Sequence, residues 1–199
     1  MSVKHPIISV VGSSGAGTST VKHVFDQIFR REGIAAVSIE GDAFHRYDRA
    51  DMKAELQRRV AAGDQTFSHF SIEANELERV FREYGETGRG HSRRYIHDET
   101  EAAVHGISPG RFTDWAPFSD DTDLLFYEGL HGAVCAEDIN IAQYGDLKIG
   151  VVPVINLEWV QKIHRDKATH GYSTDAVLRR MHAYVHVICP QFTETDINF

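Results

Sequence analysis

The residues with the clearest capacity for chemistry lie at positions 7–20, where a short apolar run breaks into a glycine-rich loop and continues in a helical pattern. The spacing matches the phosphate-binding template G-x-x-x-x-G-K-[ST], with Gly12, Gly17 and Ser19 in place. Thr18 stands where the template has lysine. Glycines let the backbone aim several N–H groups at one anion, and the dipole of the following helix favours the same charge. The loop therefore predicts a polyphosphate site that lacks one positive charge.

We expect the whole loop to contact the phosphates of a nucleotide, through Gly12, Ser13, Ser14, Gly15, Ala16, Gly17, Thr18, Ser19 and Thr20. The hydroxyl of Ser19 is expected on a phosphate-bound Mg²⁺, as is usual for the last position of the template. The alternative is an ordinary Gly/Ser-rich turn between a strand and a helix. The apolar run before the loop and the helical stretch after it favour the phosphate site.

Two carboxylates follow strand-like runs, and open α/β sheets bind ligands at the carboxyl ends of their strands. Glu128 ends an apolar run and is expected to help hold Mg²⁺ together with Ser19. Asp42 lies just after another run and is our candidate for the general base that accepts a proton from an attacking hydroxyl. The alternative for Asp42 is a cap of the next segment. His45, Arg46 and Arg49 follow closely and could hold an anionic acceptor.

Apolar strand-like runs alternate with helical patterns along the chain, which predicts an α/β fold with a mostly parallel sheet. With the phosphate loop, this indicates a P-loop NTPase fold of the nucleoside-kinase-like kind, with three αβα layers, in one domain over residues 1–199. Strands are expected at Ile7–Val11, Ala35–Ile39, Leu124–Tyr127 and Lys148–Ile155, and helices at Thr18–Glu32, Arg49–Ala62, Ile72–Tyr84, Leu157–Thr169 and Thr174–His186. Residues 85–123 are predicted to form a surface excursion that handles ligand, with a mobile insertion as the alternative.

Composition narrows the class of protein. The net charge is −8, with 29 acidic and 21 basic residues, which argues against a general nucleic-acid binder. Cys135 and Cys189 match no C-x-x-C spacing, so a reducing compartment with two inert thiols is expected. No apolar stretch approaches the ~18 residues of a membrane span, and a soluble, cytoplasmic protein is expected. The 12 histidines show no zinc-type spacing, so Mg²⁺ brought by ATP is the expected metal.

Four motifs together resemble those of bacterial-type (class I) phosphoribulokinases. They are Gly-Ser-Ser-Gly-Ala-Gly-Thr-Ser-Thr at 12–20, Glu-Gly-Asp-Ala-Phe-His at 40–45, Tyr-Glu-Gly-Leu-His-Gly at 127–132 and Ile-His-Arg-Asp at 163–166. A phosphate loop without lysine is itself a mark of that family. The resemblance implies ATP-dependent phosphorylation of D-ribulose 5-phosphate at O1, which gives D-ribulose 1,5-bisphosphate and ADP in the Calvin cycle.

The resemblance also implies roles for individual residues. It makes Asp42 the catalytic base, Glu128 the acid associated with Mg²⁺, and Asp166 a second essential acid. Lys162 is expected near the nucleotide phosphates, where with Arg165 it would compensate for the absent loop lysine. The residues expected at the sugar phosphate or the transferring group are His45, Arg49, Tyr95, His97 and Arg165.

The chain departs from the family pattern at several places. His170 occupies the position of a family arginine that binds substrate phosphate, which suggests weaker and pH-sensitive binding. The chain is a few residues short near Asn75–Arg79 and Asp175–Leu178, and family members continue beyond Phe199, so we expect a part of the family domain to be absent.

The family further implies NADH activation, AMP inhibition and a homo-oligomer, with Arg179 and Arg180 as candidate relays. An exposed arginine pair is the alternative reading of those two positions. Ala16 in place of the plant-type cysteine argues against thioredoxin control.

Two other functions stay open from the sequence. The chain could be a related P-loop kinase that acts on an unphosphorylated small molecule such as uridine or pantothenate. It could also be a truncated nucleotide-binding module without turnover. Preference for an unphosphorylated acceptor would identify the related kinase. Tight ATP binding without phosphoryl transfer would identify the nucleotide-binding module.

Overall fold

A parallel β-sheet forms the centre of the molecule. The computed structural model describes residues 4–13, 15–63, 72–136, 138–154, 160, 163–164 and 188–199. In this part of the chain the sheet has the strand order β2-β5-β1-β8-β9, and each neighbouring pair is parallel. The strands are β1 (Ile7–Gly12), β2 (Ala36–Glu40), β5 (Leu124–Gly129), β8 (Leu147–Val151) and β9 (Ile197–Asn198). The predicted α/β class with a mostly parallel sheet is confirmed.

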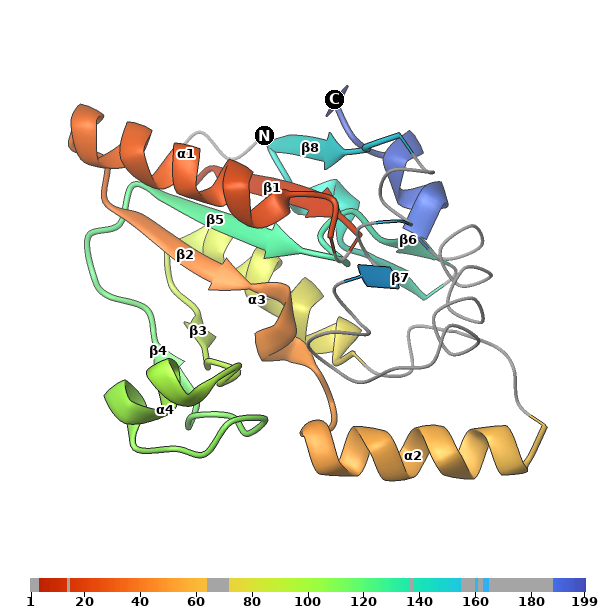
Figure 1. Cartoon of the computed structure of the whole chain (residues 1–199). Coiled ribbons are helices and arrows are strands. Elements are labelled where there is room, and N and C mark those ends of the chain that lie inside the picture. The colour runs from red at the N-terminus through yellow and green to blue at the C-terminus, as the bar shows by residue number, and fades with distance from the viewer. Residues whose placement is uncertain are drawn as a thin grey trace.

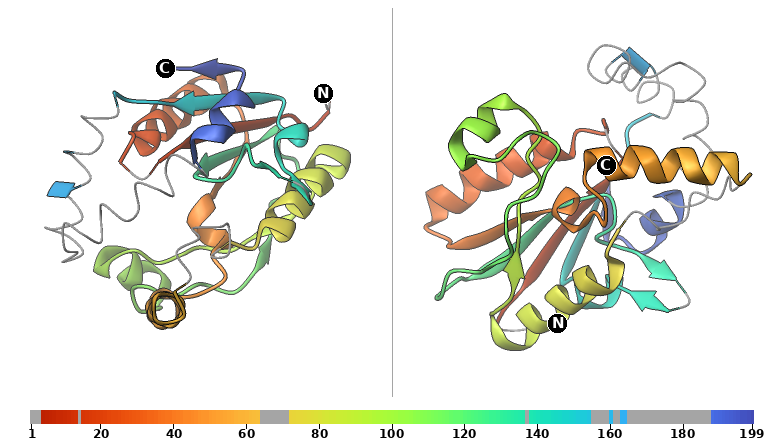
Figure 2. Two further views of the ribbon diagram at one scale, coloured as in Figure 1. Left: turned by 90° about the vertical axis from the view of Figure 1, so that its right-hand side faces the viewer. Right: turned by 90° about the horizontal axis from the view of Figure 1, so that it is seen from below.

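Helices cover both faces of this sheet. Helix α1 (Thr18–Glu32) lies on one face and α3 (Ala74–Thr87) on the other (Figure 1), and the end-on view of Figure 2 separates the same layers. Alternate residues of a strand point to opposite faces, so in β5 Phe126 packs with α1 whereas Tyr127 packs with α3. Strands buried on both faces read as continuous apolar runs, which is why the sequence locates them.

Glycines end helices α1 and α3. Helix α1 stops at Gly33, where φ is 69°, and α3 stops at Gly88, where φ is 70°. The predicted helix 72–84 is therefore displaced, because Gly85 lies inside α3 and Ile72 forms an isolated bridge with His45. The apolar side chains of α3 that face the sheet are spaced by three and four residues, as an amphipathic helix requires, and are Leu77, Val80, Phe81 and Tyr84.

The segment between α3 and β5 has its own small structure. Strand β3 (His91–Ser92) pairs antiparallel with β4 (Ala116–Pro117), and helix α4 (Glu99–His105) lies between them in sequence. Asp98 caps α4 by accepting hydrogen bonds from the N–H groups of Thr100 and Glu101. Figure 1 places this segment beside the β2 edge of the sheet.

Short elements complete the described structure. They are a 3₁₀ turn η1 (Gly41–Phe44), α2 (Arg49–Ala61), the hairpin of β6 (Cys135–Ala136) and β7 (Ile139–Asn140), and the 3₁₀ turns η3 (Ala142–Tyr144) and η5 (Cys189–Thr193). No helix in the described ranges combines the length and the apolar character needed to cross a bilayer.

Two predictions for the C-terminal third differ from the structure or lie outside it. The predicted strand 148–155 is too long, since β8 ends at Val151 just before Pro153, which cannot donate to a strand ladder. Strand β9 was not expected. The predicted helices 157–169 and 174–186 lie outside the described residues, apart from helical positions at 160, 163 and 164.

Candidate functional site

The glycine-rich loop joins the end of β1 to the start of α1. Gly15 and Gly17 have φ values of 105° and 101°, a conformation that residues with a Cβ rarely adopt. The N–H of Ala16 donates to the carbonyl of Ser13 at 2.9 Å, which closes the turn. The free N–H groups of a helix N-terminus lie next to it. This is the strand–loop–helix arrangement that the phosphate template requires, with Ser14 outside the described residues.

Thr18, at the position of the template lysine, points inward. The residue is 8% exposed, and a Cβ added to Gly12 would lie only 2.6 Å from the methyl carbon of Thr18. Its hydroxyl hydrogen-bonds the side chain of Glu128 and thereby lowers the pKa of that carboxyl. Thr18 therefore ties the phosphate loop to the end of β5. In the sequence, the only signal for this contact was the threonine at the position of the template lysine.

Glu128 combines partial burial with nearby charge. Burial raises the pKa of Glu128, and the carboxylates of Glu40 and Asp42 raise it further, whereas Thr18 and Lys22 lower it. Hard oxygen donors of this kind suit Mg²⁺, and Ser19 is exposed in the first turn of α1 on the same loop. The donor set of Ser19 and Glu128 thus fits an ion that arrives with nucleotide. No cluster of three or more His, Cys, Asp or Glu able to bind a metal occurs among the described residues.

Lys22 places a cation near these acids. Its ammonium lies 3.7 Å from a carboxylate oxygen of Glu40 and 3.5 Å from one of Asp26. Lys22 is one helical turn after Thr18, so the two share a face of α1. Our sequence reasoning missed Lys22, although its spacing from Thr18 could have identified it.

Two glycines bring the ends of β2 and β5 together. A Cβ on Gly129 would lie 2.8 Å from the Cα of Gly41 and 2.8 Å from the hydroxyl oxygen of Tyr127. Tyr127 is fully buried, and its hydroxyl accepts a hydrogen bond from the N–H of His131 at 3.1 Å. Burial raises the pKa of Tyr127. This close approach places Asp42, the residue after Gly41, beside the end of β5.

Asp42 lies between two imidazoles. Its Oδ1 is 3.7 Å from Nε2 of His45, and its Oδ2 is 3.8 Å from Nε2 of His97. Half of the Asp42 side chain is exposed, so an acceptor can reach it. Because His97 comes from the segment between α3 and β5, two parts of the chain distant in sequence meet at this carboxylate.

Arg49 and Tyr95 extend the same cluster. The Arg49 side chain donates from Nε to the hydroxyl of Tyr95 at 3.3 Å and from Nη2 to the carbonyl of His97 at 2.9 Å. The ring of Tyr95 contacts those of His45 and His97 edge-on, with centroids 6.2 and 5.0 Å apart. The structure therefore brings together all five of Asp42, His45, Arg49, Tyr95 and His97.

The remaining predicted residues cannot be placed. Lys162, Arg165, Asp166 and His170, as well as Arg179 and Arg180, lie outside the described residues. Their expected roles stay predictions.

Comparison with known proteins agrees with this geometry. A sequence profile described as "Phosphoribulokinase / Uridine kinase family" matches residues 7–199. The chain belongs to this family. It is 74% identical to phosphoribulokinase 1 of Cereibacter sphaeroides, over 100% of this chain and 71% of that protein. It is 64% identical to phosphoribulokinase of Nitrobacter vulgaris, over 98% of this chain and 70% of that one.

Solved structures place the fold in the same family. The chain superposes on the phosphoribulokinase from Rhodobacter spheroides with a TM-score of 0.86 and 68% identity, over 98% of this chain and 70% of the other. A putative fructose transport system kinase from Silicibacter sp. TM1040 shares the fold at a TM-score of 0.67 and 16% identity, over 99% of this chain and 90% of the other. The P-loop kinase fold expected from the sequence is confirmed.

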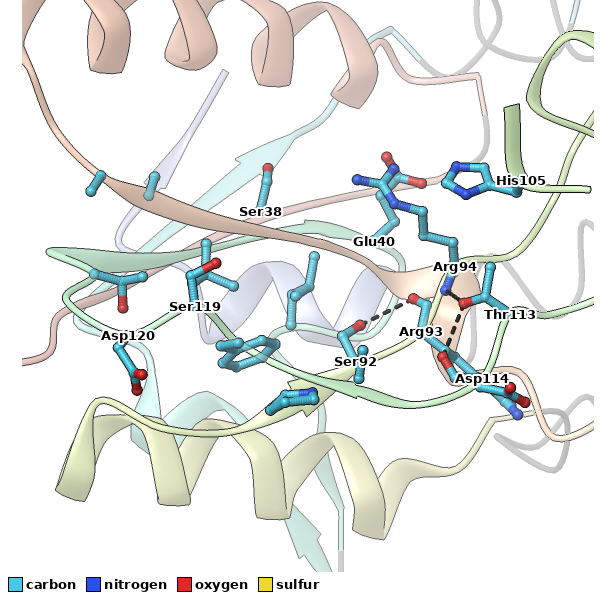
Figure 3. Close-up of a pocket in the computed structure, with 18 of the residues that line it drawn as sticks. Ser38, Glu40, Ser92, Arg93, Arg94, His105, Thr113, Asp114, Ser119 and Asp120 are labelled. Carbon is cyan, nitrogen blue, oxygen red and sulfur yellow. Dashed lines mark hydrogen bonds between the residues drawn. The ribbon is translucent and has the colours of Figure 1, made fainter. Parts of the chain in front are cut away.

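A separate open groove of about 780 Å³ runs along β2, the edge strand of the described sheet (Figure 3). The paired strands β3 and β4 form its other wall. Lys22 and Glu40 lie at the end nearest the phosphate loop, and Arg94 and His105 border the same space. None of the predicted site residues that the structure describes lines this groove, so it is distinct from the cluster around Asp42.

Proposed function

We propose that this chain is a phosphoribulokinase, which transfers the γ-phosphoryl group of ATP to O1 of D-ribulose 5-phosphate and forms D-ribulose 1,5-bisphosphate and ADP in the Calvin cycle. One observation carries the proposal beyond family membership. The half-exposed carboxylate of Asp42 stands between His45 and His97, 3.7 and 3.8 Å away, at the strand ends beside the phosphate loop. A base in that position can serve a hydroxyl that attacks a loop-bound phosphate.

The acceptor side of the reaction uses the cluster around Asp42. Asp42 accepts the proton from O1 as the oxygen attacks the γ-phosphorus. His45, Arg49, Tyr95 and His97, together with His170, hold the acceptor and its 5-phosphate. Arg49 suits this role because a guanidinium offers a fork of donors that matches phosphate oxygens.

The nucleotide side uses residues 12–20 as a cradle of N–H donors at the start of α1. Ser19 and Glu128 would hold the Mg²⁺ that comes with ATP, and a bound ion would supply positive charge to the nucleotide phosphates. Lys162 and Arg165 supply positive charge to the transferring group in place of the missing loop lysine, and Asp166 acts as a second acid.

A coupled assay of ADP release with ribulose 5-phosphate tests the proposal. The wild-type chain should turn over, and Asp42→Asn should lower kcat by about 10²–10⁴-fold, the usual contribution of a general base. Binding of a fluorescent ATP analogue should persist in the variant. Turnover that survives Asp42→Asn would exclude Asp42 as the base.

A kinase for an unphosphorylated acceptor is the second candidate, because the matched profile includes uridine kinases. A panel of ribulose 5-phosphate, ribulose, uridine and pantothenate separates the two. The cationic Arg49 beside Tyr95 favours the phosphorylated sugar. Tight ATP binding with no transfer to any acceptor would instead indicate a binding module.

The family resemblance supports three further proposals. We infer a cytoplasmic location, a homo-oligomeric assembly and activation by NADH. Sedimentation of the purified protein and an activity titration with NADH would test the last two.

A further inference from the structure

Arg93 joins the segment after α3 to the turn that carries Asp42. Its Nε donates to the carbonyl of Ala43 at 2.8 Å, and its Nη2 donates to the carbonyl of His45 at 2.7 Å. These partners lie 50 and 48 residues away in sequence. One side chain thus holds two main-chain groups of the stretch between Asp42 and Arg49.

The intervening carbonyl is also held. The N–H of Glu73 donates to the carbonyl of Phe44 at 2.7 Å, and the N–H of His45 donates to that of Asp42 at 3.2 Å. Three consecutive carbonyls after Asp42 therefore have donors from outside the turn, and Arg93 supplies two of them. A short 3₁₀ turn has poor internal hydrogen-bond geometry, so these external donors set its shape.

Aromatic rings fix the Arg93 guanidinium in place. Its central carbon lies 3.8 Å from the centroid of Phe112 and 4.6 Å from that of Trp115. Such contacts between a cation and an aromatic face are favourable and restrict side-chain rotation. Burial lowers the pKa of Arg93, while Glu73 and Glu76 oppose that effect. A guanidinium stays charged in proteins, and a charged donor strengthens hydrogen bonds to carbonyls.

We propose that Arg93 is a positioning residue for phosphoryl transfer, which holds Asp42 and His45 in register with Tyr95 and His97. The inference rests on the proposed function but assigns Arg93 no contact with substrate. Arg93 lies two residues before Tyr95, so the segment that supplies the acceptor-binding side chains also sets the position of the base. A single arginine thereby couples the two halves of the acceptor site.

Arg94 provides a matched control. Successive residues of an extended segment point in opposite directions, and Figure 3 shows the Arg94 side chain extending into the groove beside β2, away from Arg93. Arg94→Met removes the same charge as Arg93→Met, one position further along the chain. Because Arg94 is exposed, this substitution should disturb little of the surrounding structure. It should leave kcat and both KM values within about twofold of wild type.

The kinetic test compares Arg93→Met, Arg93→Lys and Arg94→Met. For Arg93→Met we expect kcat to fall about 10- to 100-fold, since displacement of a reacting group by about 1 Å can cost that much. KM for ribulose 5-phosphate should rise, and KM for ATP should change by less than twofold. Arg93→Lys should recover part of the loss, because lysine keeps the charge but has a single donor nitrogen in place of the planar fork.

A double variant separates positioning from general damage. If Arg93 acts through Asp42, adding Arg93→Met to Asp42→Asn should lower kcat by less than twofold, whereas a merely structural role would multiply the two losses. Multiplied losses would overturn the proposal. So would an Arg93→Met enzyme within threefold of wild type in kcat and KM.

Amide hydrogen exchange supplies a readout that does not depend on activity. Peptides covering residues 41–46 should exchange faster in Arg93→Met and Arg93→Lys, while those of α3 stay unchanged. If Arg93→Met does not fold, Arg93→Lys carries the test, and unchanged exchange in 41–46 would exclude the proposal. A wild-type chain inactive on ribulose 5-phosphate would contradict the proposed function but not this result.

Discussion

At the scale of single residues, the site is defined by contacts that cross the chain. Thr18 fills the position of the template lysine, yet its hydroxyl hydrogen-bonds Glu128, which lies at the end of a different strand. Asp42 stands between His45 and His97, and Arg49 contacts Tyr95. Apart from the local contact of Asp42 with His45, each contact joins a residue near the N-terminus to one from the segment after α3 or from β5. Substitution of one side chain should therefore affect function more than folding.

Thr18→Val should weaken use of Mg²⁺·ATP. Valine keeps the shape of threonine but cannot donate to Glu128, and a hydrogen bond to a charged group contributes about 1.5–3 kcal/mol. We expect the Mg²⁺ concentration for half-maximal activity to rise about tenfold, as measured by initial rates over a Mg²⁺ series. Thr18→Ser keeps the hydroxyl and should resemble wild type. An equal loss in both variants would count against the role of this hydrogen bond.

At the scale of elements, close backbone contacts and local ion pairs set the position of the site. Gly41 and Gly129 bring the ends of β2 and β5 together. Glu76 of α3 contacts both Arg79 on its own helix, at 2.6 Å, and His91 of β3, at 2.5 Å. The second contact ties the segment that carries Tyr95 and His97 to the helix beneath the sheet.

Gly129→Ala and Gly85→Ala should have opposite effects on stability. The new Cβ at position 129 would lie 2.8 Å from the Cα of Gly41, so the strand ends must separate, at a cost of about 1–3 kcal/mol. At position 85, inside α3, the nearest atom is 3.8 Å away, and removing a helical glycine should stabilise by up to about 1 kcal/mol. Urea denaturation measures both. Equal changes in the two variants would contradict this reasoning.

Glu76→Gln should alter the pH dependence of stability. A hydrogen bond from Arg79 has the largest effect on the pKa of Glu76 and lowers it below its ordinary value of 4.5. A hydrogen bond from His91 lowers this pKa as well. A lowered acid pKa stabilises the fold above pH 4.5, and this contribution disappears as the pH falls through the native-state pKa. The variant should lose about 1 kcal/mol or less near pH 7 and little at pH 3. Denaturation curves at pH 7 and pH 3 measure the loss of stability at each pH. A loss of equal size at both pH values would exclude this account.

At the scale of the whole molecule, two apolar layers enclose the sheet and hold the strand ends in register. Phe126 of β5 is fully buried against α1. Its ring centroid lies 5.1 Å from that of Phe25 and 5.6 Å from that of Phe29. On the opposite face Phe81 packs against Tyr127 at 5.4 Å. The phosphate loop and the acids at the strand ends depend on this packing without taking part in it.

Phe126→Ala should destabilise the fold by about 3–5 kcal/mol, because it removes a buried ring and leaves a cavity. Phe126→Leu should cost much less. The midpoint of urea unfolding measures the effect, and the activity of the folded fraction should change little. A loss of less than about 1 kcal/mol for the alanine variant would show that α1 and the sheet do not form one core.

The sequence by itself determined the sheet strands with two buried faces, the phosphate loop and the chemical identity of Asp42 and Glu128. These signals are local, since buried runs, glycine spacing and strand-end acids can be read within about ten residues. Helix α3 shows the limit, because two glycines lie within four positions and only the structure decides that Gly88, not Gly85, ends the helix.

Only the tertiary structure decided which residues meet. The inward turn of Thr18 toward Glu128, the Lys22–Glu40 ion pair and the two hydrogen bonds of Arg93 join segments that are distant in sequence. Strand β9 likewise forms because its residues pair with β8, not because its two-residue length has intrinsic strand preference. The sequence specifies the groups that do the chemistry, whereas long-range packing determines the distances between them.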